Sequence, residues 1–504
     1  MWRTQTNLTQ KSVLPGFDSY NDTYREEVNS TALPKNFYLE HPRILYDNDK
    51  DRFLMLSVLT DKVDFMYSKL LLAFSKTGSP STGLEEDWDR VIIEVSDLQE
   101  ELGEALWATL PTIAVDNNTI YITADMMYRE EENPDIITGV NQVDKFVESR
   151  LWTLDKELVY ATGLRDVINT DMVEEVDGSL MSTSLEFDLQ VHRMVYENEL
   201  GVEVMKGQWI PSHMDAEEEF GMYFVHYHGE DVEEDDTEQL SVLFYSKVTG
   251  ELSDALIDLG DVEDRSLPFY NATQPRDIEL DRALLWDELI YSDIFTGTRR
   301  AQDAVWWNET LYVAVTVSKT IRVNETQVYW VALTAPSTNE TTGDLLEFID
   351  DEMIEVVKDG YVTGDAIEKT IVDPENGQVS IVPAFNSSTF FPSIAVNNKG
   401  EIVIGFSAAG EELYMGSYTQ EVGVPYSIPD LNITEKAITI AQGDAAYESI
   451  NGIPYAGDYS GMVVDPIEPN CFWSFNSYAM SLDAVELHSW ERGALATRWG
   501  KVCL

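Results

Sequence analysis

The sequence has few basic residues, few cysteines and no long apolar run, and each shortage excludes a class of protein. Its 504 residues carry 33 Lys and Arg against 91 Asp and Glu, which gives a net charge of −58. So strong a negative charge repels phosphate backbones and excludes nucleic acid as the main partner. No apolar run approaches the roughly 18 residues that a membrane-spanning helix needs. We therefore expect no membrane span, and a strongly acidic, solvated surface.

The two cysteines, Cys471 and Cys503, both lie near the end of the chain. Two such residues in an oxidising compartment are more often paired than free, so we predict a disulfide between them. Closing a loop of this length would stabilise the fold by roughly 3 to 4 kcal/mol in the chain-entropy model. Two buried free thiols are the alternative interpretation.

Sequons for N-glycosylation are more frequent than chance pairing of Asn with Ser or Thr would give. Each glycan needs an exposed position in a secreted protein, so their number favours an extracellular or cell-surface location. Residues 1–5 begin no apolar signal segment. Either a signal segment has been removed or missed, which we favour, or the chain is not secreted and the sequons reflect a surface rich in Asn and Thr. The candidate acceptors are Asn7, Asn21, Asn29, Asn117, Asn271, Asn308, Asn324, Asn339, Asn386 and Asn432.

An internal repeat predicts the fold. Each repeat has an apolar strand that ends at Asp or Asn, a short polar turn and a second strand, which is the pattern of a hairpin. The turns fall at Asp47, Asp116, Asn397 and Asp465, with a weaker one at Asn308 and a further candidate at Asp215. Their spacing suits one four-stranded blade for each repeat, so we predict an all-β chain that forms a six-bladed β-propeller. Seven blades are the alternative, because residues 165–205 could hide another.

The first and last repeats differ in their number of strands. Four strands can be identified in the first repeat, at residues 43–46, 52–59, 69–75 and 88–95, but only three in the last, at 459–464, 472–478 and 492–502. We expect residues 13–39 to donate the missing strand, which would leave no open sheet edge. The predicted organisation is an N-terminal segment, residues 1–40, followed by one propeller domain, residues 41–504. A short helix is expected within residues 276–291.

The last repeat also carries a resemblance to a known group of proteins. Residues 458–460 (Asp-Tyr-Ser), 465–466 (Asp-Pro), 472–473 (Phe-Trp), Trp499 and Cys503 resemble the C-terminal blade of uncharacterised secreted β-propellers of the sialidase-like, BNR-type superfamily, which reads W-G-D-Y-S, D-P, F-W, W, C. Similar motifs cover most of residues 41–165 and 380–504. The resemblance implies a secreted propeller and no settled activity. Tyr and Ala at 455–456 stand where the group usually has Arg-Trp.

Because sialidases are six-bladed propellers, a glycoside hydrolase that uses the central funnel is the alternative function. Arg43, Asp47 and Arg300 could supply parts of its arginine cluster and its acid. However, the Ser-x-Asp-x-Gly-x-Thr-Trp turn that usually marks sialidase blades is absent from the sequence. Analogy of fold does not establish function, and these arginines are expected to pair with the plentiful carboxylates.

Asp458 and Asp465 are the candidate metal ligands, because they flank one predicted strand and Ca²⁺ prefers carboxylate oxygens. A turn Asp that accepts hydrogen bonds from its own backbone is the alternative, which we favour in the absence of a D-x-D-x-D-G loop. His226 and His228 alternate along a strand, and a zinc site there would need a third ligand, His213 or Asp215. A structural role for these two histidines is the interpretation that we favour.

Together these observations predict an extracellular, N-glycosylated β-propeller that acts as a binding or structural protein of a cell surface or matrix. Its expected partner is an extracellular glycan or protein, and Ca²⁺ is the candidate cofactor.

Overall fold

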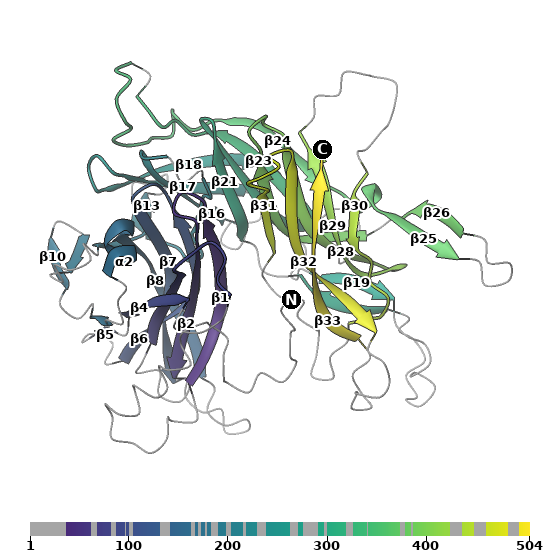
Figure 1. The fold of residues 1–504 in the computed structure, drawn as a ribbon, viewed down its shortest axis with the longest axis horizontal. Coiled ribbons are helices and arrows are strands. Elements are labelled where there is room, and N and C mark those ends of the chain that lie inside the picture. The colour runs from purple at the N-terminus through teal and green to yellow at the C-terminus, as the bar shows by residue number, and fades with distance from the viewer. Residues whose placement is uncertain are drawn as a thin grey trace. The chain divides into compact units, whose positions relative to one another are not determined.

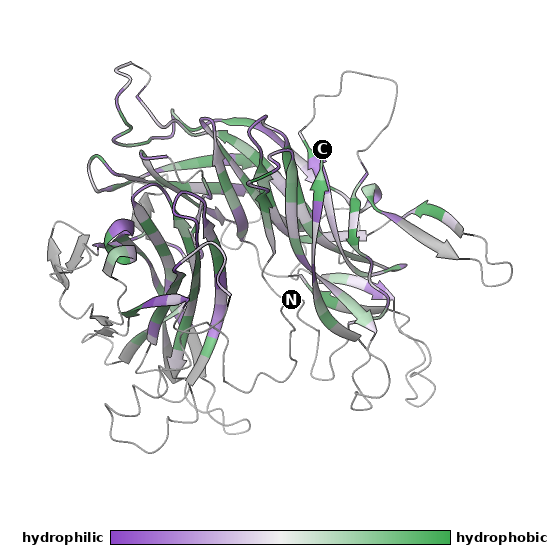
Figure 2. Ribbon diagram, viewed as in Figure 1, coloured by the Kyte–Doolittle hydropathy of each residue, from purple (hydrophilic) through white to green (hydrophobic). Residues whose placement is uncertain are grey.

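The computed structural model describes most of the chain between residues 37 and 504. The described residues are 37–61, 68–81, 87–95, 97–99, 104–131, 142–162, 167–169, 173–176, 179–182, 190–197, 203–214, 218–228, 238–262, 271–275, 291–296, 300–318, 326–339, 341–372, 379–384, 387–423, 436–447, 460–481 and 493–504. They are nearly all in antiparallel β-sheets (Figure 1). One α-helix, α2 (Lys156–Thr162), and one 3₁₀ turn, η2 (Gly364–Ala366), are the helical elements among them. Figure 2 shows hydrophobic residues along the strands and hydrophilic residues at the turns.

Six of the sheets have the up-and-down strand order of propeller blades, and the fold class is a six-bladed β-propeller, as the sequence predicts. The chain forms two compact units, residues 1–224 with 243–253, and residues 225–242 with 254–504. Strands of the third blade contribute to both units.

The first unit contains the first and second blades. The first blade consists of β1 (Phe37–Asp47), β2 (Arg52–Asp61), β3 (Ser68–Ser75) and β4 (Trp88–Glu94), with β9 (Val167–Asn169) parallel to β4. The second consists of β6 (Glu104–Val115), β7 (Thr119–Glu131), β8 (Gln142–Asp155) and β12 (Gln190–Arg193), extended by β5 (Asp97–Gln99), β10 (Val173–Val176) and β11 (Ser179–Ser182). One hydrophobic cluster joins Leu54 and Leu72 of the first blade to Ile113, Ile122 and Trp152 of the second.

The third blade consists of β15 (Ile210–Pro211), β16 (Gly221–His228), β17 (Glu238–Ser246) and β18 (Leu252–Gly260). The hairpin of β13 (Val195–Glu197) and β14 (Glu203–Met205) precedes it. Residues 165–205 therefore supply short added strands, and their described part forms no seventh blade.

The second unit contains the fourth, fifth and sixth blades. The fourth blade consists of β21 (Ala301–Trp307), β22 (Thr310–Ser318), β23 (Thr326–Thr334) and β24 (Val356–Val362). The fifth consists of β27 (Ser387–Val396), β28 (Ile402–Gly410), β29 (Leu413–Val422) and β30 (Ile438–Ala441). The sixth consists of β31 (Gly461–Val464), β32 (Cys471–Ser481) and β33 (Gly493–Cys503). Two further hairpins are β19 (Asn271–Pro275) with β20 (Tyr291–Phe295), and β25 (Glu368–Val372) with β26 (Val379–Pro383). Tyr312 and Trp330 of the fourth blade pack with Ile394, Ile404 and Phe406 of the fifth.

The sixth blade has three strands within the described residues, as the sequence predicts. The third strands of the other blades are almost wholly buried, but Trp499 on β33 is 65% exposed. The segment predicted to donate the missing strand, residues 13–39, falls outside the described residues except for 37–39, which pair with β2. Donation of a closing strand by residues 13–36 stays a prediction. Of residues 276–291, where a helix is expected, 276–290 also lie outside the described part, and Tyr291 is the first residue of β20.

Three first strands of blades share a bulge that the sequence analysis missed. His41, Leu110 and Phe391 have positive φ angles of 53°, 48° and 51°. Each stands directly before a proline, and the strand register shifts at each of these positions. In each case the bulged strand contains one extra residue, and the residue before the proline adopts the left-handed region. A proline inside an otherwise regular predicted strand could have indicated each bulge from the sequence.

Candidate functional site

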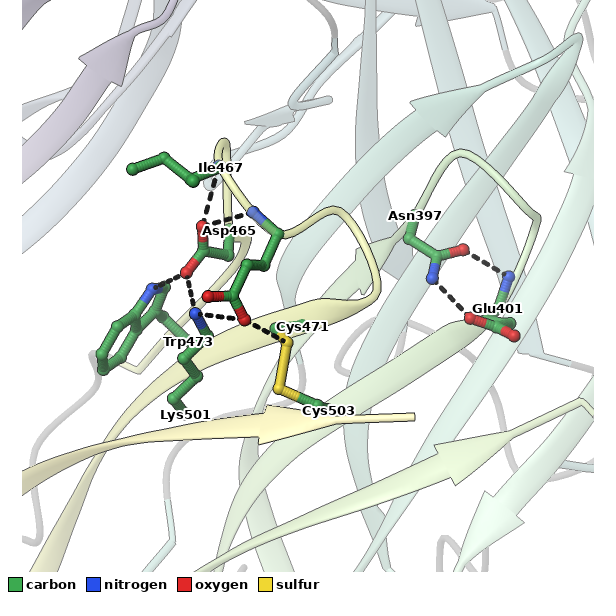
Figure 3. Close-up of a disulfide and its surroundings, with 9 residues drawn as sticks. Asn397, Glu401, Asp465, Ile467, Cys471, Trp473, Lys501 and Cys503 are labelled. Carbon is green, nitrogen blue, oxygen red and sulfur yellow. Dashed lines mark hydrogen bonds and ion pairs between the residues drawn. A yellow bond between two sulfur atoms is a disulfide. The ribbon is translucent and has the colours of Figure 1, made fainter.

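The predicted metal ligand Asp465 lies in the turn between β31 and β32, where protein donors already surround its carboxylate (Figure 3). Its Oδ1 accepts backbone N–H groups of Ile467 and Glu468 at 2.8 and 2.9 Å. Its Oδ2 accepts the indole N–H of Trp473 at 2.9 Å and lies 2.6 Å from Lys501 Nζ. The Lys501 ammonium and these backbone donors hold the pKa of the Asp465 carboxyl well below its usual range.

Lys501 thus occupies the place that a cation would take at this turn. Its Nζ also lies 3.1 Å from the Glu468 carboxylate, so one ammonium is shared by two acids. The second predicted ligand, Asp458, falls outside the described residues. Calcium binding by Asp458 and Asp465 stays a prediction, and an ion at Asp465 would have to displace Lys501.

The predicted disulfide between Cys471 and Cys503 is confirmed, with an S–S distance of 2.04 Å. The two cysteines are directly opposite each other on β32 and β33, beside the Asp465 turn. Glu468 lies close to both sulfur atoms in a spacing that resembles a metal site. Because both sulfurs are in the disulfide, neither is a thiolate, and this group is not a cation site.

Asp47, the candidate acid of the hydrolase hypothesis, is in the same kind of turn in the first blade. It is fully buried, and its Oδ1 accepts the backbone N–H groups of Asp49 and Lys50. Lys156 Nζ lies 3.2 Å from Asp47 Oδ2, and the Tyr160 hydroxyl donates to the same oxygen at 2.8 Å. Lys156 is also fully buried. The Asp47 carboxylate thus accepts hydrogen bonds from its own turn and is buried with a lysine and a tyrosine.

Asp116 repeats the arrangement in the second blade. Its Oδ1 accepts the backbone N–H of Asn118 and of Thr119, and the Tyr121 hydroxyl donates to Oδ2 at 2.7 Å. Lys247 Nζ lies 2.7 Å from this carboxylate. Buried turn carboxylates at positions 47, 116 and 465 are therefore each paired with a lysine, and the turn role predicted for them is confirmed.

The lysine partners were missed in the sequence analysis. Lys156 directly follows β8, the third strand of the second blade, and binds Asp47 of the first blade. Lys247 directly follows β17, the third strand of the third blade, and binds Asp116 of the second blade. Lys501 differs, because it lies on β33, the third strand of the same blade as Asp465. In a chain with only 33 basic residues, a lysine at this recurrent position was a usable signal. It requires the strand order of the blades to be known first.

The two arginines of the hydrolase hypothesis lie in different compact units. Arg43 Nε donates to the backbone carbonyl of Pro111 at 3.0 Å, so it joins the first blade to the second. Arg300 is half-buried just before β21, in the other compact unit.

His226 and His228 lie side by side on β16, with ring centroids 4.7 Å apart. His228 Nε2 is 2.6 Å from the Ser241 hydroxyl, and both imidazoles are buried. Within the described residues no further His, Cys, Asp or Glu joins them in a cluster of metal-binding size.

Three of the predicted sequons can be examined. Asn308 is exposed, with a φ of 49°, in the turn between β21 and β22. Asn339 is half-buried and accepts the N–H groups of Thr341 and Thr342. Asn117 is half-buried and donates to Glu219. Asn271 is the first residue of β19, and the remaining sequons lie outside the described residues.

A cavity of about 330 Å³ lies beside the fifth and sixth blades. Val403, Thr419 and Glu421 come from β28 and β29, and the remaining lining residues are Lys436, Ile438, Val502 and Leu504. The walls thus combine aliphatic side chains with one hydroxyl and one pair of opposite charges. No helix in the described part of the chain has the length and apolar character of a membrane span.

The strand order of the six blades defines this chain as a β-propeller protein. No protein-family model and no curated protein matches it. Among solved structures, it is similar to a protein of unknown function from Dyadobacter fermentans, at 8% identity over 94% of this chain and 96% of that one, with a TM-score of 0.36.

Two further likenesses are to a sialidase and to a semaphorin. Trypanosoma rangeli sialidase is 10% identical over 92% of this chain and 55% of its own, with a TM-score of 0.30. The extracellular domains of Drosophila Semaphorin 1b are 9% identical over 92% of this chain and 86% of theirs, with a TM-score of 0.29. At these scores the likenesses establish nothing about the function of this chain.

Proposed function

We propose that this chain is an extracellular, N-glycosylated β-propeller that acts as a binding or structural protein of a cell surface or matrix. The Cys471–Cys503 disulfide carries the proposal, because it pairs both cysteines of the chain and such bonds persist in oxidising compartments. The exposed turn position of Asn308 suits a glycan acceptor, and a net charge of −58 suits a surface that stays soluble at high ionic strength.

Binding is preferred to hydrolysis because of the state of Asp47. A glycosidase needs a carboxylic acid within reach of the scissile bond. Asp47 is instead fully buried and is bonded to Lys156, Tyr160 and the backbone. Ca²⁺ remains the proposed ion for the acidic surface.

The test is production of the chain behind a secretion signal in a eukaryotic host. The proposal expects the purified protein to contain no titratable thiol and to lose mass on treatment with peptide N-glycosidase F. Asn308→Gln should remove one glycan, whereas Asn48→Gln, an exposed asparagine outside any sequon, should remove none. A secreted protein with two free thiols and no glycan would overturn the proposal.

A second measurement addresses calcium and catalysis on the same sample. Ca²⁺ binding predicts a rise in melting temperature with added CaCl₂ that EDTA reverses, because a ligand of the native state stabilises it. Turnover of fluorogenic glycosides that is abolished by Arg43→Ala would favour the hydrolase instead.

A further inference from the structure

The contact between the fifth and sixth blades contains a group of buried polar side chains that have no hydrogen-bond partners within the described residues. Ser393, Ser417 and Thr419 on the fifth blade are buried, as are Ser474 and Asn476 on the sixth. Within the described residues, none of their hydroxyl oxygens and not the Asn476 amide nitrogen has a hydrogen-bond partner. Buried polar atoms are nearly always satisfied, so a group of five points to an occupant that supplies the missing bonds.

These side chains form one continuous layer. Gly405 on β28 pairs with Ser393 on one side and with Thr419 on the other. A Cβ on Gly405 would lie 2.8 Å from Ser474 Oγ and 3.2 Å from Asn476 Nδ2. The glycine therefore lets the two sheets approach closely and brings the hydroxyls of both blades together.

The layer adjoins the cavity described above at Thr419, which is buried and is also one of the cavity's lining residues. Val403, Ile438 and Val502 supply apolar walls. The two charges at the rim do not favour an ionic ligand, since Glu421 and Lys436 are opposite in sign and Lys436 Nζ also lies 2.5 Å from Glu368. A cavity of about 330 Å³ has room for one sugar ring.

We propose that this cavity, which we call the β29–β33 site, binds an uncharged, polyhydroxylated ligand of monosaccharide size. The hydroxyls of the ligand would bond Thr419 and Glu421, and its C–H face would lie against the aliphatic walls. A bridging water would connect it to Ser474 and Asn476. This inference rests on the binding function proposed above and adds a ligand class and a site to it.

The experiment is saturation-transfer NMR on the full chain with N-acetylglucosamine, galactose and mannose, each added separately. We expect transfer to at least one sugar, and binding about tenfold weaker for Thr419→Val, which keeps the side-chain shape and removes the hydroxyl. Thr439→Val on β30 is the matched control, because Thr439 is exposed and does not line the cavity. It should bind as the wild type does.

Three outcomes would overturn the inference: no transfer to any of the sugars, equal binding by Thr419→Val and the wild type, or a crystal structure of soaked protein with only ordered water in the cavity. The melting temperature of Thr419→Val should equal or exceed that of the wild type. This result would show that weaker sugar binding by the variant is not caused by loss of the folded structure. A secreted, glycosylated protein that binds none of the sugars would refute the β29–β33 site and leave the proposed location intact.

Discussion

Replacing Lys156 by methionine should destabilise the protein far more than the loss of an ordinary surface lysine. Lys156 and Asp47 are both fully buried, and the ammonium is 3.2 Å from the carboxylate. Methionine fills most of the volume of the lysine stem but leaves Asp47 charged and without its cation. Removing one partner of a buried pair costs about 3 to 5 kcal/mol, a large part of the roughly 5 to 15 kcal/mol by which a domain is stable.

The measurement is the urea unfolding midpoint of Lys156→Met, of Asp47→Asn and of the double variant. Asp47→Asn keeps an oxygen that can accept the turn hydrogen bonds, so the double variant should recover much of the loss. Lys50→Met is the control, because Lys50 pairs with Glu157 at 2.6 Å but both are partly exposed. An exposed pair contributes less than about 1 kcal/mol. Equal losses for Lys156→Met and Lys50→Met would refute the reasoning.

Three further predictions concern histidine, cysteine and the last turn. Burial lowers the pKa of His192 to about 4, whereas in the unfolded chain it is about 6.5. Between these two pH values the unfolded state binds more protons than the folded state. The free energy of unfolding should therefore fall by up to about 3 kcal/mol as the pH drops from about 6.5 to about 4. Unfolding curves of His192→Gln should lack this loss. Replacing both Cys471 and Cys503 by alanine should cost roughly 3 to 4 kcal/mol and remove the effect of reductant on the melting temperature; unchanged sensitivity would contradict it. The pKa of Asp465 is depressed, so its contribution is present above its ordinary pKa and is lost as pH falls through the folded value. Lys501→Met should move the acid unfolding midpoint to higher pH.

The hairpins of the blades were predictable because local signals determine them. An apolar strand that ends at Asp47 or Asp116 turns sharply, since the carboxylate accepts the N–H groups of the next residues. Asn397 does the same in the fifth blade, where it accepts the N–H of Lys399 and of Glu401. Each of these signals lies within a few residues of the turn, so it can be read without the fold.

The partners of these turns were not predictable from local signals. Lys156 is 109 residues from Asp47, and Lys247 is 131 residues from Asp116. Residues this far apart in the sequence cannot be recognised as partners until the arrangement of the blades is known. The same holds for the short strands β10 to β14, which are too short to be identified by periodicity and pair only in the folded chain. Thr419 and Ser474 likewise look like ordinary strand residues until their burial is known.

The bond between Cys471 and Cys503 gives the final strand a second covalent attachment. If a protease cut the chain anywhere in residues 482–492, the peptide that contains β33 would no longer be joined to β32 through the backbone. The disulfide would still hold it to β32. Nicked and intact molecules would then have the same mass under non-reducing conditions, apart from the added water. The 11 residues of β33 would leave only after reduction, so a cut at the end of this chain does not by itself open its last blade.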